Sequence, residues 1–434
     1  MIKNLLWRKE MKLYLYRLIT FLLKPVVRPV LFLRRKKGLE TTDKNRRGER
    51  FGYASIKRPA GKVFWFNAAS VGESNSIIPL VDKILETYKD VSVLITTTTL
   101  TSANNMAKKL DGKRAFHQFL PIDRRAYVDR FLDYWKPSVG FFVDSDFWPN
   151  LILSAKSKKI PLIVINGRIS DKSFAKYKEN LSFCNPLMSA FIYGFGKSEE
   201  DRKRLEVMGV KTTTCVGNLK YAVAPLSYNK DELTKLQNMI GDRPVFVVSS
   251  THPGEEERLL CSFLTIKKRY PNVLMVIAPR HPARGSEIKE LVEVNGLKAA
   301  LRSEGEVIKS NTDIYIANTM GELGLFYTLS NVVFVGGSFA PIGGHNPMEP
   351  ARLHCVVLSG KLVHNFKETY DILVNENCVV MVSDEEDLAS KVKSFFEHPD
   401  IMKQYMNKAF DVAERESAVL DRVMDKLQPI LDNI

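Results

Sequence analysis

The stretch "SNVVFVGGSFAPIGGHNPMEPA", residues 330–351, decides the fold. It opens with an apolar run typical of a strand that is buried on both faces of a parallel sheet. Four glycines and three prolines follow, and the stretch ends in residues that resemble a helix start. A strand that runs through glycines into a helix is one unit of a sheet covered by helices, and such sheets bind ligands at the carboxyl ends of their strands.

The same alternation of apolar runs and amphipathic segments extends through most of the 434 residues. The β-rich runs before residue 222 are KVFWFNA, VSVLITTT, SVGFFVD, IPLIVING, SAFIYGFG and TTTCVGN. Those after residue 242 are RPVFVVSS, NVLMVIAPR, DIYIAN, NVVFVGG, CVVLSG and CVVMVS. The pattern predicts an α/β protein with two doubly wound halves that face a common cleft.

The domain boundaries follow from changes in this pattern. We expect a Rossmann-like domain over residues 48–221, a polar linker over 222–242 and a second Rossmann-like domain over 243–398. Residues 399–434 have the amphipathic pattern of a helical segment, and residues 1–47 form a separate basic and apolar segment.

Positive charge is concentrated near the start of the chain. The formal net charge is +15, and residues 1–62 contain 18 Lys and Arg against 4 Asp and Glu, which leaves 46 against 45 in the rest. Nucleic-acid-binding proteins usually spread basic residues along a groove of their folded domains. Basic residues beside an apolar run favour an anionic membrane surface instead, so we expect no nucleic-acid partner.

The apolar run is "LYLYRLITFLLKPVVRPVLFLRRKK", residues 13–37. A spanning helix needs about 20 residues with almost no charge, yet Arg17, Lys24 and Arg28 interrupt this run. Their spacing places these three on one helical face, which predicts a helix lying on the membrane. The apolar residues on the opposite face are Leu15, Ile19, Leu22 and Leu23. A tilted signal-anchor span and a helix packed on the protein's own core remain alternatives.

The glycines of the opening stretch predict an anion site. Without side chains, backbone N–H groups near residues 336–346 can face a phosphate at contact distance. Asn346 and Glu349 follow at a spacing of three, where a carboxylate could accept ribose hydroxyl groups. The alternative is a loop that only needs positive φ angles.

Two further turns in the second half fit the same nucleotide site. "APRHPARG", residues 278–285, offers the planar guanidinium of Arg280 to phosphate oxygens. "TMGELG", residues 319–324, is a turn with a glycine and an acid after an apolar strand. Taken without context, Arg280 and His281 are more often surface residues than functional ones.

In the first half, Glu73 of "FNAASVGESNS", residues 66–76, follows a strand end. It could act as a general base or only complement a helix dipole. Asp144 and Asp146 resemble the D-x-D motif that holds a divalent metal in another glycosyltransferase fold, although a match this short is common by chance. The histidines show no metal-binding spacing, and we expect no metal site.

The ordered motifs FNAASVGES, DFWPN, INGRIS, VGNLKYA, APRHPARG, TMGELG and VGGSFAPIGGHNPMEPA resemble those of the 3-deoxy-D-manno-octulosonate (Kdo) transferases. The resemblance runs from about Gly48 to the end of the sequence. It implies a GT-B fold, location on the cytoplasmic face of the Gram-negative inner membrane, and inverting transfer of Kdo from CMP-Kdo to the lipid A precursor, lipid IVA, without a cofactor.

The resemblance also implies roles for individual residues. Glu73 would accept the proton, and Asp144 and Lys220 would stabilise the transition state. The residues implied to contact CMP are Pro279, Arg280, Met320, Gly321, Glu322, Asn346, Pro347, Met348 and Glu349.

The sequence departs from the usual family pattern at several positions. The family has Glu-x-Glu where this chain has Asp144 and Asp146, His at position 67 where this chain has Asn, and Asp at Asn318 and Ala222. The shorter side chain at Asp144 weakens that assignment most, because a shift of about 1 Å in a catalytic group costs a large factor in rate.

Two other functions remain possible from the sequence. Sugar-nucleotide epimerases share the fold, although an epimerase has no use for a basic, apolar N-terminus. A nonenzymatic membrane-surface binding protein is the second alternative.

Overall fold

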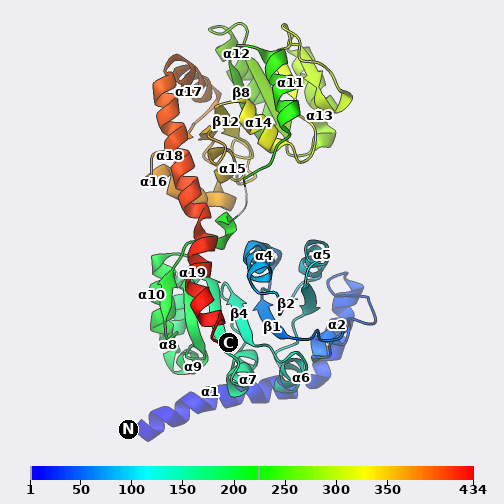
Figure 1. Cartoon of the computed structure of the whole chain (residues 1–434), viewed down its shortest axis with the longest axis vertical. Helices are drawn as coiled ribbons and strands as arrows, with labels where there is room; N and C mark the ends of the chain where they lie inside the picture. The colour runs from blue at the N-terminus through cyan, green and yellow to red at the C-terminus, as the bar shows by residue number, and fades with distance from the viewer. Residues whose placement is uncertain (1, 223–224) are drawn as a thin grey trace. The chain divides into compact units, whose positions relative to one another are not determined.

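The computed structural model of the chain describes residues 2–222 and 225–434, with side chains from residue 12 onward except that of Ser182. The chain forms two compact units (Figure 1). Unit 1 comprises residues 1–223 and 418–434, and unit 2 comprises residues 224–417.

Unit 1 is built on a parallel sheet with the strand order β3-β2-β1-β4-β5-β6-β7. Its strands are β1 (Lys62–Asn67), β2 (Val91–Thr97), β3 (Ala115–Phe119), β4 (Val139–Val143), β5 (Leu162–Gly167), β6 (Phe191–Gly196) and β7 (Thr213–Cys215). Both faces of the sheet are buried. Along β1, Phe64 and Phe66 belong to one core and Val63 and Trp65 to the other, which explains the unbroken apolar run.

Helices cover both faces of this sheet. One face is covered by α4 (Ile78–Thr87), α5 (Leu100–Lys109) and α19 (Val419–Leu431). The other is covered by α6 (Arg125–Trp135), α7 (Pro149–Ser157), α9 (Leu181–Met188) and α10 (Glu199–Met208).

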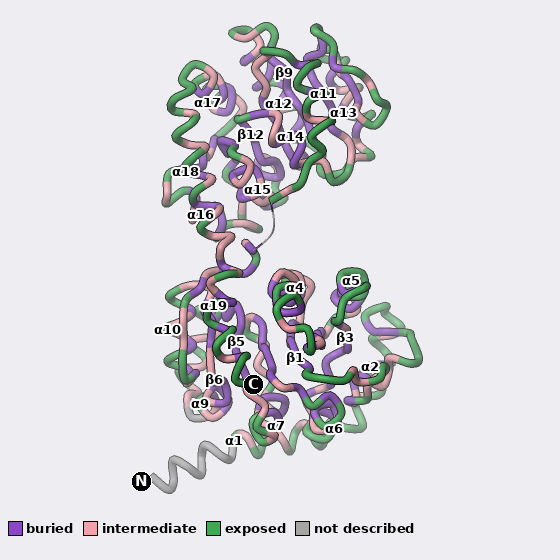
Figure 2. The backbone as a smooth tube through the Cα atoms, in the orientation of Figure 1, coloured by how far each residue is buried: buried purple, intermediate pink, exposed green. Residues whose placement is uncertain are grey.

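Unit 2 repeats the plan with the strand order β10-β11-β9-β8-β12-β13-β14, again with parallel pairing. Its strands are β8 (Val245–Thr251), β9 (Leu274–Pro279), β10 (Ala299–Leu301), β11 (Ile314–Ile316), β12 (Val332–Val335), β13 (Val356–Ser359) and β14 (Val379–Met381). The central strands of both sheets are buried (Figure 2), whereas the edge strands β7 and β14 are partly exposed.

The helices of unit 2 also form two layers. One layer contains α11 (Lys230–Ile240), α14 (Leu323–Leu329), α15 (Met348–Ala351), α16 (Lys367–Asn375) and α18 (Pro399–Ser417). The other contains α12 (Glu256–Lys267), α13 (Gly285–Val294) and α17 (Glu385–Glu397). The predicted α/β class with two Rossmann-like domains is therefore confirmed.

Some segments differ from the expected boundaries. Helix α11 lies within the stretch predicted as a linker, because Leu236 and Ile240 pack into the core of unit 2. The segment predicted over 399–434 divides between the units: α18 belongs to unit 2 and α19 to unit 1. Strands β3 and β10 were absent from the predicted set.

The first two helices, α1 (Ile2–Leu22) and α2 (Lys24–Lys36), belong to unit 1, and polar side chains of α1 bind the rest of that unit. Lys12, Tyr16 and Thr20 recur every fourth residue. Lys12 Nζ donates to Asn180 Oδ1 (2.8 Å), and Tyr16 Oη donates to Asp123 Oδ2 (2.7 Å). Within the described residues, no helix combines the length and apolar character that a membrane crossing needs.

Most apolar residues of these helices are exposed, although Leu31 of α2 is buried, and this differs from the usual burial of the apolar face of a helix in a globular protein. Exposed fractions reach 59% for Phe21 and 61% for Leu22. The four residues that the sequence placed on the apolar face are all exposed: Leu15, Ile19, Leu22 and Leu23. The helix α1 therefore packs on unit 1, as one alternative held, but through its polar face.

We predict that Gly52→Ala destabilises unit 1 by about 2–5 kcal/mol. Gly52 has φ +82°, and an added Cβ would lie 2.0 Å from the carbonyl oxygen of Tyr127. All four tryptophans of the chain lie in the sequence of unit 1, so urea unfolding followed by tryptophan fluorescence reports on this unit.

Gly112→Ala is the matched control. Gly112 has a similar φ of +71° but open space around it, so only the cost of the left-handed backbone, about 1–2 kcal/mol, is expected. Equal losses for the two variants would contradict the predicted clash.

Candidate active site

Both sheets change winding direction between two neighbouring strands, and this position opens a crevice for ligands in doubly wound folds. In unit 1 these strands are β1 and β4, and in unit 2 they are β8 and β12. Glu73 and Asp144 follow β1 and β4, whereas His252 and the glycine loop follow β8 and β12. The topology therefore selects two clusters of polar residues, one in each unit.

Glu73 is held at the start of the short helix α3 (Val71–Ser76). Its backbone N–H donates to Oγ of the N-cap residue Ser70 (3.2 Å), and Ser70 Oγ–H donates back to Glu73 Oε1 (2.8 Å). The backbone N–H of Ala69 donates to Oε2 (2.8 Å). The arrangement resembles a capping box, except that the carboxylate accepts from the N–H before the N-cap residue and from the N-cap hydroxyl. It fixes the carboxylate while leaving the residue partly exposed.

Asp144 and Asp146 form a carboxylate cluster with Glu73. Burial raises the pKa of Asp144, and the negative charge of Glu73 raises it further, while Arg168 and Lys197 act in the opposite direction. Burial also raises the pKa of Asp146, which accepts a hydrogen bond from the indole of Trp148 (2.9 Å). Among the described residues, no group of three His, Cys, Asp or Glu side chains is arranged to hold a metal.

Asn67 and Lys220 lie near this cluster. Asn67 ends β1, is fully buried and accepts a hydrogen bond from Thr96 Oγ1 (3.1 Å), but its Nδ2 has no hydrogen-bond partner in the described chain. Lys220 is exposed on the 3-10 turn Leu219–Tyr221, which contacts α3. Asn166 at the end of β5 fixes this turn by accepting from the N–H of Leu219 (2.9 Å).

In unit 2 the structure brings Arg280, Asn346 and Glu349 together. Burial raises the pKa of Glu349 above its usual value. A hydrogen bond from Asn346 Nδ2 (3.3 Å) and the charge of Arg280 offset this rise only in part. The guanidinium of Arg280 is exposed and makes no hydrogen bond or ion pair to residues 2–222 or 225–434. It is available to a ligand beside a carboxylate that can accept hydroxyl groups.

The other predicted CMP contacts lie at the same edge of the sheet but differ in environment. Met320 is 74% exposed, and Gly321 adopts φ +81°. Glu322 is bound by Arg302 through two hydrogen bonds (2.7 and 2.5 Å), which lower its pKa. Three of the predicted residues are buried and shape the backbone: Pro279, Pro347 and Met348.

Residues 337–340 of the glycine loop do not present the free backbone donors that the sequence predicted near residues 336–346. The N–H groups of Gly337, Ser338 and Phe339 donate to the carboxylate of Glu255 at 2.7, 3.0 and 2.8 Å. Ala340 N and His252 N donate to the same carboxylate (3.3 and 3.0 Å). Glu255 is fully buried, so this part of the expected phosphate site is filled by the chain's own anion.

The glycines are nevertheless required. A Cβ at position 336 would lie 2.8 Å from the carbonyl oxygen of Ser249, and Gly337 has φ +67° with the ring of His345 beside it. The sequence indicated that some group closely approaches the glycine backbone. In part, these groups are the backbone of β8 and the ring of His345.

Three histidines, which the sequence analysis did not assign to the site, surround Arg280. Nε2 of His252 and Nε2 of His345 are 2.9 Å apart, and their rings stack. The ring of His281 packs edge-on against His252. Burial, together with His252 and the charge of Arg280, lowers the pKa of His345 to about 4.

The missed residues had weak signals in the sequence. His252 and Glu255 directly follow the predicted strand RPVFVVSS, and His345 lies in the opening stretch itself, so their position at strand ends was available. Lys197 follows the predicted strand SAFIYGFG. Its charge acts on Asp144, 53 positions earlier, and only the parallel sheet brings the two together.

Comparisons with known proteins agree on one family. Residues 45–223 match the family described as "3-Deoxy-D-manno-octulosonic-acid transferase (kdotransferase)". A 3-deoxy-D-manno-octulosonic acid transferase of Rickettsia bellii is 33% identical over 94% of this chain and 97% of its own length. One of Haemophilus influenzae is 30% identical over 90% of this chain and 92% of its own length.

A solved structure with a similar fold is UDP-GlcNAc 2-epimerase from Neisseria meningitidis bound to UDP-GlcNAc. It has a TM-score of 0.55 and 14% identity, and the match covers 85% of this chain and all of that one. At this identity the likeness concerns the fold alone.

We predict that Asp144→Asn stabilises unit 1 at pH 7 by on the order of 1 kcal/mol. A carboxyl whose pKa is raised in the folded state contributes stability below its unfolded pKa of about 4 and loses it as pH rises through the folded value. Asn removes this loss and tolerates the φ of +63° at this position.

Urea unfolding followed by tryptophan fluorescence should show the gain at pH 7 and a smaller gain at pH 4. Asp111→Asn, at an exposed position, is the control and should change little. A gain of equal size at both pH values would contradict the raised pKa.

We predict that Glu255→Gln opens the glycine loop. Loss of the charge weakens the five backbone hydrogen bonds, and a bond to a charged group is worth about 1.5–3 kcal/mol. Amide hydrogen exchange at residues 337–340 should accelerate at least about tenfold. The neighbouring Glu257 is exposed, and Glu257→Gln should leave this exchange unchanged; equal acceleration in both variants would refute the assignment.

Proposed function

Since the chain belongs to the 3-deoxy-D-manno-octulosonic acid transferase family, we propose that it transfers Kdo from CMP-Kdo to a lipid A precursor in lipopolysaccharide biosynthesis. Membership makes it a glycosyltransferase enzyme. The observation that carries the proposal further is the accessible, positioned carboxylate of Glu73 at the switch point of unit 1.

Glu73 serves as the proton acceptor in this proposal. It takes the proton from an acceptor hydroxyl, either of the lipid's glucosamine or of a first Kdo, as the oxygen attacks the anomeric carbon of Kdo. Attack opposite the phosphate inverts the configuration. The raised pKa of Asp144 lets that carboxyl keep a proton at higher pH than an exposed one, which limits the negative charge around Glu73.

The leaving CMP is assigned to unit 2. Breaking the bond to phosphate builds negative charge, which Arg280 offsets with a guanidinium that has no other partner in the described chain. Glu349 and Asn346 lie beside Arg280, where they can meet ribose hydroxyl groups. Lys220 would pair with the carboxylate of Kdo or with the phosphate. The proposed reaction uses CMP-Kdo as substrate and needs no cofactor.

Two features of unit 1 support a lipid as acceptor. Helices α1 and α2 expose a row of apolar side chains. Together with the residues that follow them, up to residue 62, they carry most of the excess positive charge of the chain. A cavity of about 610 Å³ lies between α1 and the helices α8 (Asp171–Glu179) and α9. Its lining includes Leu15, Ile19 and Phe183 together with Lys12 and Lys176, which suits an acyl chain with an anionic group.

The same features support a location at the cytoplasmic face of the inner membrane. Each basic residue near an anionic surface contributes roughly 1 kcal/mol to binding, and the exposed apolar row adds burial in the interface. An epimerase activity, the main alternative, is suggested only by fold likeness at 14% identity. The exposed apolar helices have no use in an enzyme of soluble sugar nucleotides.

We predict that Glu73→Gln lowers kcat for Kdo transfer by about 10²–10⁴-fold, the usual contribution of a general base. The oxygen of Gln can still accept from the N–H of Ala69, and its NH2 group can donate to Ser70 Oγ, so tryptophan-detected stability and the affinity for CMP should change little. Transfer is measured by mass spectrometry of lipid IVA after incubation with CMP-Kdo.

Glu86→Gln, on the exposed surface of α4, is the control and should retain full activity. A Glu73→Gln enzyme that keeps its rate within a factor of a few would exclude Glu73 as the base. Absence of transfer by the unmodified protein would exclude the proposed function itself.

A further inference from the structure

A smaller cavity of unit 1, of about 340 Å³, lies apart from the carboxylate cluster, between α2, the loop that follows it and α6. Four of its lining residues carry a positive charge, and none carries a negative one. The four are Lys24, Arg28, Arg47 and Arg130. The rest of the lining is Gly48 with the aromatic residues Phe51, Tyr53 and Tyr127.

The contacts of these cations leave their charges uncompensated. Arg130 donates to the carbonyl oxygen of Phe51, and its guanidinium lies over the ring of Tyr53 (4.1 Å). Arg47 donates to the carbonyl oxygen of Thr42 (2.9 Å), while its Nε is buried without a hydrogen-bond partner. In the part of the chain that the structure describes, none of the four makes an ion pair.

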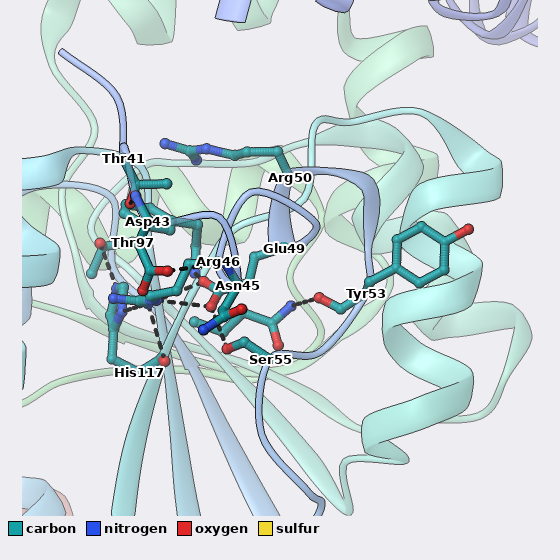
Figure 3. A network of polar contacts seen from close by, with 12 residues as sticks. Thr41, Asp43, Asn45, Arg46, Glu49, Arg50, Tyr53, Ser55, Thr97 and His117 are labelled. Carbon is teal, nitrogen blue, oxygen red and sulfur yellow. Dashed lines mark hydrogen bonds and ion pairs between the residues drawn. The ribbon is translucent and has the colours of Figure 1, made fainter. Parts of the chain in front are cut away.

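Two neighbouring arginines of the same loop, Arg46 and Arg50, are instead paired with carboxylates, and Figure 3 shows the pair of Arg46 with Glu49. Arg46 binds Glu49 through two hydrogen bonds (2.9 and 3.0 Å), and Arg50 binds Glu40 (3.0 Å). Glu49 also accepts from the N–H of Phe119 (2.6 Å) at the end of β3. This buried network neutralises the arginines that face the sheet and fixes the loop that forms one wall of the cavity.

A concentration of unpaired cations in one hollow is unfavourable unless an anion binds there, because like charges repel. A phosphate monoester carries a charge of about −1.5 to −2 and three acceptor oxygens, and guanidinium groups match those oxygens in geometry. Beside the cavity, α2 exposes Val26, Val30, Phe32 and Leu33, so that a phosphate bound here can belong to a molecule with acyl chains.

We propose that this cavity binds a phosphate monoester of the acceptor lipid and so sets how that lipid is placed on unit 1. The inference rests on the proposed function, because it takes the acceptor to be a phosphorylated lipid. Binding of phosphate outside the carboxylate cluster lets the enzyme recognise the acceptor without adding negative charge next to Glu73.

The test compares two double variants that remove the same charge from α2 and its C-cap residue. Lys24→Gln with Arg28→Gln alters the cavity, whereas Lys36→Gln with Lys37→Gln alters exposed residues outside it. KM is measured for lipid IVA and for its enzymatically dephosphorylated form. We expect the cavity variant to raise KM for lipid IVA at least about tenfold, as for loss of a charge-assisted hydrogen bond, and to leave KM for the dephosphorylated lipid close to that of the control.

Binding is measured separately from transfer, on phosphatidylcholine vesicles that contain lipid IVA, its dephosphorylated form or phosphatidic acid. The expected result is a preference for lipid IVA over the dephosphorylated form that is lost only in the cavity variant. Equal behaviour of the two double variants overturns the proposal, since general attraction to a charged surface would then explain both. A preference for phosphatidic acid without an effect on KM overturns it in favour of a phospholipid headgroup.

Failure of the inference and failure of the proposed function are distinguishable. If the unmodified protein transfers Kdo but the two double variants do not differ, the cavity assignment is wrong and the function stands. If the unmodified protein transfers no Kdo to either acceptor, the function is wrong, and the vesicle measurement still decides whether the cavity binds phosphate.

Discussion

Parallel pairing across the point where each sheet reverses its winding is the constraint on which the polar clusters depend. Strands β1 and β4 in unit 1, and β8 and β12 in unit 2, are neighbours in the sheet although two or three strands separate them in the chain. The connections leave such a pair in opposite directions, which opens a crevice at the ends of the two neighbouring strands. Because the strands are neighbours, Glu73 and Asp144 lie together there in unit 1, and His252 and His345 do so in unit 2.

Some of the groups that could bind a charged ligand are already paired with charged side chains of the same chain, whereas others have no such partner among the described residues. Glu255 occupies the backbone donors of the glycine loop, and Glu49 and Glu40 neutralise the arginines that face the first sheet. Buried groups of this kind stabilise loops that would otherwise leave unpaired donors. Arg280 and the cations beside α2 have no such partner in the described chain, and these are the positions assigned to ligands.

Much of the fold was predictable because strands buried on both faces are continuous apolar runs. The exceptions have physical reasons: β3 reads AFHQF and is an edge strand whose His117 and Gln118 make hydrogen bonds, and β10 has only three residues. The position of Glu73 after a strand end was also predictable, and so was the need for glycine after β12. The occupant of the glycine loop was not, because Glu255 lies about 80 residues earlier and only the pairing of β8 with β12 brings it there.

The assignment of α19 to unit 1 has a consequence for synthesis on the ribosome. Val419, Val423, Leu427 and Leu431 belong to the same core as residues of β1 and β4, so unit 1 lacks part of its core until α19 has emerged. At about 5–20 residues per second, the roughly 200 residues in between take on the order of 10–40 s to translate. During that time unit 2 can complete its own core, so that the half encoded second is the first able to finish folding, and chaperones that shield apolar surface are most needed by the half encoded first.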